Sequence, residues 1–121
     1  MKYILLIYGD EMTWNSIKDS ASQQDAERIY AAHNAYGDKM AKAGVIRGGA
    51  ELKPTSTATS IRFNNSKPTT TDGPFAETKE QLGGYYLVEA ADRAAAAAIA
   101  AKIPGARFGS IEVRPIMTFG S

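Results

Sequence analysis

Apolar residues recur with two different periods along the chain, and these periods predict its main elements. Residues 3–8 are apolar at every position, which is typical of a central strand covered on both faces. From Ser22 onward apolar residues recur every three or four positions, which predicts a helix that Gly44 ends in a left-handed conformation. A second, alanine-rich helix is predicted to be capped by Asp92 and to end near Ile103.

Shorter apolar or alternating segments predict the other strands. They are residues 45–52, 59–63, 67–71, 84–89 and 110–116. Asn64-Asn65-Ser66 is predicted to form a hairpin turn, and Pro68 places the return strand at an edge. The order is strand, helix, two or three strands, strand, helix, strand. It predicts an α+β, ferredoxin-like βαββαβ sandwich with an antiparallel sheet, as a single domain over residues 1–121.

Both helices of such a fold lie on one face of the sheet, so the other face is open. Residues 3–8 and 85–88 are nevertheless apolar on both sides. A second copy of the chain is the simplest cover for that face, and we therefore predict a homodimer.

Composition excludes several classes of protein. The chain has no cysteine, which excludes disulfides and thiolate metal sites and fits a cytoplasmic protein. Its formal charge of +1 gives no field that would attract nucleic acid or an anionic membrane. No run approaches the ~18 apolar residues of a membrane span. A single histidine makes a poor metal site, so we expect no metal and no cofactor.

The loop Thr69–Gly84 is the most polar long connection in the chain. Asp72 is predicted to accept backbone N–H groups at the entry to a short helical turn over residues 75–77, which begins after Pro74. Long loops in small domains are commonly functional, and Glu77 and Lys79 are candidates for binding a substrate. The alternative is a structural loop whose acidic residues face water.

His33 and two arginines complete the candidate chemistry. His33 lies on the apolar stripe of its helix, either as a half-buried histidine bonded to a neighbour or as a general base or acid. A carboxylate partner would raise its pKa above the reference of ~6.5. Arg62 and Arg114 alternate with apolar strand residues, so they point away from the helices, where they could hold a substrate carboxylate or form structural ion pairs with Glu89 or Glu112.

The nine residues Asp72–Glu80, DGPFAETKE, resemble the signature of DGPF-domain proteins within the wider YCII-related family. The similarity extends over residues 1–10, 43–45, 78–86 and 111–115. It implies a ferredoxin-like chain that pairs as a dimeric α/β barrel, in a superfamily with muconolactone isomerase-like enzymes and a dehydrochlorinase. The family's helix histidine corresponds to His33. The aspartate proposed to pair with that histidine precedes a proline, and here Ile103 precedes Pro104, which leaves Asp72 as the candidate partner.

Two functions follow from these observations. The first is an isomerase- or lyase-type enzyme that transfers protons on a small organic acid, with His33 as base or acid, Asp72 orienting it and Arg62 or Arg114 on the carboxylate. The second is a non-catalytic module that binds a ligand or a protein. The resemblance suggests a bacterial regulatory role for this module, because some family members are encoded beside, or fused to, extracytoplasmic-function sigma factors.

Overall fold

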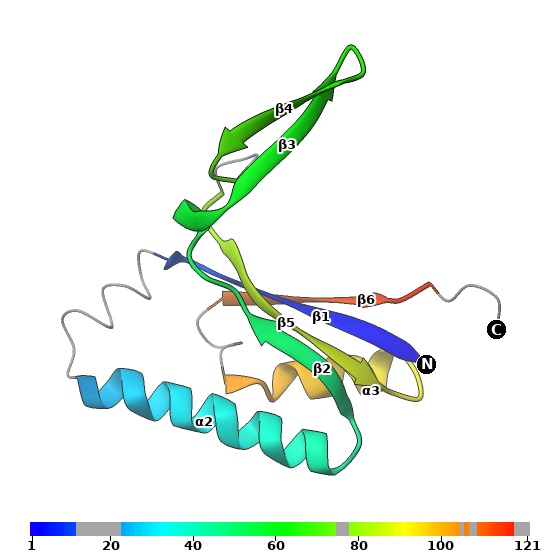
Figure 1. The fold of residues 1–121 in the computed structure, drawn as a ribbon. Coiled ribbons are helices and arrows are strands. Elements are labelled where there is room, and N and C mark those ends of the chain that lie inside the picture. Colours follow the sequence, from blue (N-terminus) through cyan, green and yellow to red (C-terminus); the bar gives the residue numbers. More distant parts are fainter. Residues whose placement is uncertain (12–22, 75–77, 105, 107–108, 118–121) are drawn as a thin grey trace.

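The computed structural model describes residues 1–11, 23–74, 78–104, 106 and 109–117. Its elements are β1 (Lys2–Gly9), α2 (Gln23–Lys42), β2 (Ile46–Glu51), the short 3₁₀ turn η1 (Thr55–Thr57), β3 (Thr59–Asn64), β4 (Lys67–Asp72), β5 (Gln81–Glu89), α3 (Arg93–Ala101) and β6 (Gly109–Pro115). A single four-stranded antiparallel sheet has the order β2-β5-β1-β6. Both helices lie on one side of it (Figure 1), so the predicted ferredoxin-like α+β fold is confirmed.

Local signals in the sequence determine where the helices begin and end. The carboxylate of Asp92 accepts a hydrogen bond from the Ala95 N–H at 2.8 Å, as predicted for a helix cap. Gly44 closes α2 with φ +75°, the left-handed conformation that glycine adopts without steric cost. No helix among the described residues is long and apolar enough to span a membrane.

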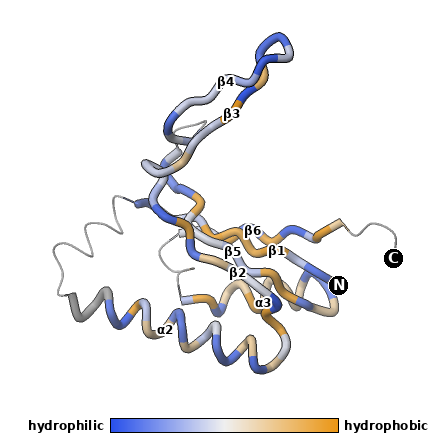
Figure 2. Tube along the Cα trace, in the orientation of Figure 1, coloured by the Kyte–Doolittle hydropathy of each residue, from blue (hydrophilic) through white to orange (hydrophobic). Residues whose placement is uncertain are grey.

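The hydrophobic core lies between the sheet and the helices. Its fully buried side chains are Leu5 and Val88 from the two central strands and Ile103 after α3. Hydrophobic positions gather along β1, β5, β6 and α3, whereas β4 and its turn are hydrophilic (Figure 2). Ile103, the residue before Pro104, is therefore a core side chain.

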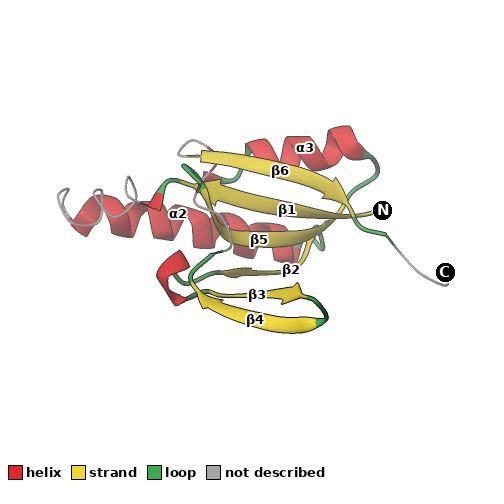
Figure 3. Ribbon diagram, turned by 90° about the horizontal axis from the view of Figure 1, so that it is seen from above, coloured by secondary structure: helices red, strands yellow, loops and turns green. Residues whose placement is uncertain are grey.

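The β3–β4 hairpin forms a two-stranded sheet of its own, outside the four-stranded sheet. Asn65 and Ser66 adopt φ values of 52° and 67° between the strands, so the predicted turn is confirmed as a two-residue hairpin loop. Every residue of β4 is exposed, because its threonine-rich sequence offers no apolar face to bury. Seen from above, the hairpin extends beyond the β2 edge (Figure 3), and it rises on the side away from the helices (Figure 1).

Alternation along the strands separates the two faces of the four-stranded sheet. Opposed residues of an antiparallel pair share a face, and the buried pair Tyr3–Val88 identifies the helix-covered face. By the same register the open face carries, among others, Ile4, Leu6, Tyr85, Leu87, Glu112 and Arg114. The four apolar residues of this set are only partly covered in the single chain.

Candidate functional site

His33 lies in the middle of α2 and faces the helix-covered side of the sheet. Its Nε2 atom is 2.7 Å from the hydroxyl of Tyr86 on β5, and the two rings stack with centroids 5.6 Å apart at 23°. The alternation that buries Val88 also turns Tyr86 toward the helices, and the helical stripe turns His33 toward the sheet. This pair is the centre of the candidate site.

Two glycines leave the space that the Tyr86 ring occupies. A Cβ atom on Gly37 of α2 would lie 3.6 Å from the Tyr86 hydroxyl, in ordinary contact. A Cβ atom on Gly49 of β2 would lie 2.7 Å from Cδ1 of Tyr86 and 2.6 Å from the carbonyl oxygen of Tyr85, closer than real side chains approach. Glycine at position 49 is therefore required by the packing of the ring.

Glu51 is the carboxylate that acts on this pair. It ends β2, and the Tyr30 hydroxyl donates a hydrogen bond to its Oε1 atom at 3.4 Å. A bulge brings it to this face: Ile46 opposes Val88, but Gly48 opposes Leu87, so one extra residue, Arg47, is inserted. Without that residue every later side chain of β2 would change face, and Glu51 would point away from His33.

Burial and charge decide the protonation of the site. Burial lowers the pKa of His33 below its reference value, and the negative charge of Glu51 opposes part of this decrease. Burial also raises the pKa of Tyr86, with smaller contributions in the same direction from Tyr36 and Glu51. The imidazole and the phenol are therefore both neutral near neutral pH, and the phenol holds its proton.

Tyr36 supports the same region from the next turn of α2, on the side of the helix that also carries His33. Its hydroxyl donates a hydrogen bond to the Ile99 carbonyl of α3 at 2.9 Å, which ties the two helices together. Burial raises the pKa of the Tyr36 hydroxyl, so this donor stays protonated. The helix that carries His33 is thereby fixed against both α3 and the sheet.

The structure brings only His33, among the residues singled out from the sequence, into this cluster. Asp72 ends β4 and is exposed, and no hydrogen bond or ion pair among the described residues joins it to His33. Its predicted role as the orienting carboxylate stays a prediction. The predicted turn over residues 75–77, with Glu77, lies outside the described residues, and Lys79 is exposed in the bend before β5.

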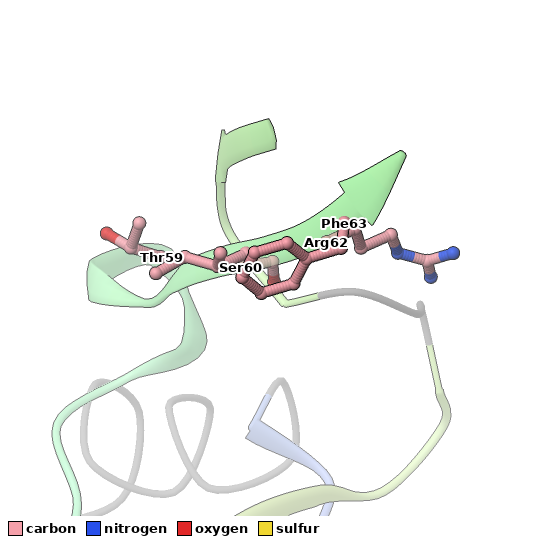
Figure 4. Close-up of a pocket in the computed structure, with 5 residues that line it drawn as sticks. Thr59, Ser60, Arg62 and Phe63 are labelled. Carbon is pink, nitrogen blue, oxygen red and sulfur yellow. The ribbon is translucent and has the colours of Figure 1, made fainter. Parts of the chain in front are cut away.

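The two arginines lie elsewhere. Arg62 is exposed on β3, where it lines a shallow hollow along the hairpin (Figure 4). Arg114 forms an ion pair with Glu112 on the open face of the sheet, which confirms one of the two predicted ion pairs. The sheet separates Arg114 from His33 within one chain, so its role as a carboxylate ligand stays a prediction.

The described residues contain no group of three or more histidine, aspartate or glutamate side chains that could hold a metal ion. The side chains of the site itself offer a neutral imidazole in contact with a protonated phenol, beside a carboxylate.

Comparisons with known proteins bear on the family and the fold of the chain. The model of the YCII-related domain matches residues 1–120. An uncharacterised protein of Rhizobium meliloti is 36% identical over 121 residues, which cover 98% of this chain and 94% of that protein. The solved structure of a 5-chloro-2-hydroxyhydroquinone dehydrochlorinase from Burkholderia phenoliruptrix, in complex with 2,5-dihydroxybenzoquinone, superimposes with a TM-score of 0.53. It is 18% identical and the match covers 97% of this chain and 94% of the dehydrochlorinase chain, so the likeness concerns the fold.

Proposed function

Because the chain belongs to the YCII-related family and holds one histidine against a phenol and a carboxylate, we propose that it is a small acid–base enzyme. Its reaction is of the isomerase or lyase type, on a small organic acid, and it works as a homodimer. The single observation that carries this proposal is the 2.7 Å contact between Nε2 of His33 and the Tyr86 hydroxyl.

His33 is the base in this reaction. A neutral imidazole accepts a proton from a carbon next to a carbonyl group: the C–H bond breaks, an N–H bond forms, and the electron pair moves onto the carbonyl oxygen as an enolate. The proton then returns to a different carbon in an isomerisation, or a leaving group departs in an elimination. The lowered pKa of His33 keeps the base unprotonated over most of the neutral range.

Tyr86 and Glu51 assist the base. In the tautomer that acts as base, the protonated Nε2 of His33 donates a hydrogen bond to the Tyr86 oxygen, which fixes the ring and leaves the lone pair of Nδ1 to take the substrate proton. The raised pKa of Tyr86 keeps the phenol itself protonated. The negative charge of Glu51 favours the imidazolium that forms when His33 takes the proton. The name of the similar structure, a dehydrochlorinase bound to a small quinone, supports a small-molecule reaction of this kind.

A second copy covers the open face in this proposal. Ile4, Leu6, Tyr85 and Leu87 form an apolar patch across the two central strands of that face. Burying this patch removes apolar surface from water, which contributes about 25 cal/mol for each Å² before the entropic cost of association is subtracted. Sedimentation velocity at micromolar concentration measures the mass directly.

The test of the chemistry needs no known substrate. The protein is incubated in D₂O with 2-oxobutanoate, acetoacetate and levulinate, which are small enolisable oxo acids, and proton NMR follows the loss of their C–H signals. We expect catalysed exchange with the native chain and no catalysis with His33→Ala, whose fold is checked by circular dichroism. Tyr86→Phe is expected to retain partial exchange, because the imidazole remains but loses the hydroxyl that fixes its ring.

Exchange that persists in His33→Ala would contradict the assignment. So would a His33 ring signal that does not titrate until the protein unfolds, because the imidazole would then have no access to a substrate. This signal needs no assignment, since the chain contains one histidine.

A further inference from the structure

The β3–β4 hairpin, called the arm below, has the features of a segment that binds a surface outside its own chain. It pairs only with itself, and its two large apolar side chains, Ile61 and Phe63, are 62% and 75% exposed. They are two residues apart on one strand, so they share one face of the hairpin. A pair of exposed apolar residues on one face is typical of a contact surface.

The arm stands on a fixed base. The carboxylate of Glu11, just after β1, accepts hydrogen bonds from the N–H and the hydroxyl of Thr55, both at 2.8 Å. At the same base, where β3 begins and β4 ends, the Ser60 hydroxyl donates to the Gly73 carbonyl at 2.6 Å, and the Gly73 N–H donates to the Ala58 carbonyl at 2.7 Å. These bonds hold the angle at which the hairpin leaves the body.

That angle makes a corner with the sheet. The hairpin rises beside the β2 edge on the side away from α2 and α3 (Figures 1 and 3), so the open face is the floor of the corner and the arm is its wall. The floor carries the apolar patch of Ile4, Leu6, Tyr85 and Leu87. The open face and the hairpin therefore each present apolar side chains that are at most partly covered within one chain.

The area of the floor alone is small for a stable dimer. Four strands about 4.8 Å apart and about eight residues long, at ~3.3 Å per residue, make a face of roughly 500 Å². Stable interfaces bury about 800 Å² on each partner. A hairpin about 20 Å long and about 10 Å wide adds roughly 200 Å² on one face, which supplies most of the difference.

We infer that the β3–β4 hairpin is a dimerisation arm, whose Ile61 and Phe63 pack against a second copy of this chain seated on the open face of the sheet. A two-fold axis makes the contact reciprocal, so each copy both inserts an arm and receives one, and the interface closes without leaving a free apolar surface. This inference rests on the homodimer of the proposed function, but it assigns the arm a role that the acid–base chemistry does not require.

The test is the double variant Ile61→Thr/Phe63→Thr. Threonine favours strands, and both positions are exposed, so the hairpin is expected to fold. Met117→Thr is the matched control: Met117 is 74% exposed and follows β6. Sedimentation velocity over a dilution series gives the dissociation constant of each dimer. We expect the double variant to raise this constant by at least about a hundredfold, since a symmetric dimer loses four anchors, and the control to leave it unchanged.

Hydrogen exchange provides a second measurement that needs no variant. The amides of residues 59–72 are expected to exchange slowly above the dissociation constant of the native dimer and quickly below it. The role of the hairpin in dimerisation would be contradicted if the native chain and the double variant dimerise with the same dissociation constant. It would also be contradicted if the amides of residues 59–72 exchange at the same rate at all concentrations. Either result would leave the proposed dimer and the proposed chemistry intact. A native chain that sediments as a monomer would overturn the arm together with the homodimer, and the D₂O exchange assay would still test His33 separately.

Discussion

The two faces of the four-stranded sheet are encoded by the same strands and have opposite uses. On β1, Leu5 is 0% exposed beneath the helices, whereas its neighbour Leu6 is partly exposed on the open face. On β5, Tyr86 bonds to His33, whereas Tyr85 lies on the open face. One face therefore holds the core and the candidate site, and the other carries the apolar surface at which we propose that a second copy binds. Neighbouring residues of one type on opposite faces offer matched pairs for testing this division.

The largest difference is expected between Leu5→Ala and Leu6→Ala. Leu5 is fully buried, so its truncation removes apolar contacts and leaves a cavity, at a cost of about 2–5 kcal/mol in the free energy of unfolding. Leu6 is partly exposed, so its truncation should lower the free energy of unfolding of a dissociated chain by about 1 kcal/mol or less. Urea unfolding of both variants, at concentrations below the dimer dissociation constant, gives the two values.

The dissociation constant of the proposed dimer should be more sensitive to Leu6→Ala than to Leu5→Ala, the opposite of the order expected for unfolding. Leu6→Ala is expected to weaken the proposed dimer, because Leu6 lies on the face that a second copy covers in that proposal. Leu5→Ala is expected to leave the dissociation constant of the dimer unchanged once the chain is folded. Equal destabilisation of the folded chain by the two substitutions would contradict the division between the faces.

A smaller difference is expected between Gly49→Ala and Gly48→Ala. The Cβ atom at position 49 would lie 2.7 Å from the Tyr86 ring, whereas at position 48 its nearest contact is Cδ1 of Leu87 at an ordinary 3.5 Å. The first substitution must displace the ring or the backbone, at a cost of about 1–3 kcal/mol, and it should disturb the His33–Tyr86 contact. The second should be nearly neutral. Thermal unfolding and the His33 ring shifts measure both effects, and an unchanged His33 spectrum in Gly49→Ala would contradict the packing described here.

The sequence predicted the fold because each element carries a local signal. The continuous apolar runs in residues 3–8 and 84–89 became the central strands, and Asp92 and Gly44 limit their helices as expected. The separation of the β3–β4 hairpin from the main sheet was not predicted, because alternation defines a strand but not the sheet to which it belongs.

The partners of His33 could not be found in the same way. Tyr85 and Tyr86 are adjacent and equivalent in the sequence, and only the register of β5 determines which one faces α2. Glu51 reaches the site through the bulge at Arg47, which the hydrophobic pattern of residues 45–52 does not reveal. Because Ile103 precedes Pro104 in place of the aspartate that the family resemblance implies, the sequence leaves Asp72 as the candidate partner of His33. A search for one-residue bulges near the Gly48-Gly49 pair is the signal that could have found Glu51.

The smallest and most specific effect is expected from Glu51→Gln and Glu112→Gln, a pair of carboxylates on opposite faces. Glu51 raises the pKa of His33 through its charge, so Glu51→Gln should lower that pKa further below its reference, whereas Glu112→Gln, across the sheet, should leave it in place. A proton NMR titration of the single imidazole measures both. A lower pKa of His33 in Glu112→Gln, or an unchanged pKa of His33 in Glu51→Gln, would contradict the assignment of Glu51 to the site.

The same shift has a consequence for stability. Burial holds the pKa of His33 in the folded chain below the ~6.5 of the unfolded chain, so below that pH the unfolded chain binds more protons. His33 therefore adds its full stability above about pH 6.5, and this stability is lost as the pH falls toward the pKa of the folded state. Glu51→Gln moves that folded-state pKa lower, so the decrease in unfolding free energy must continue to a lower pH than in Glu112→Gln. If the unfolding free energies of the two variants fall along the same curve as the pH decreases, once scaled to each other, the charge of Glu51 does not affect the imidazole. The neutral state of the His33–Tyr86 pair would then depend on burial alone.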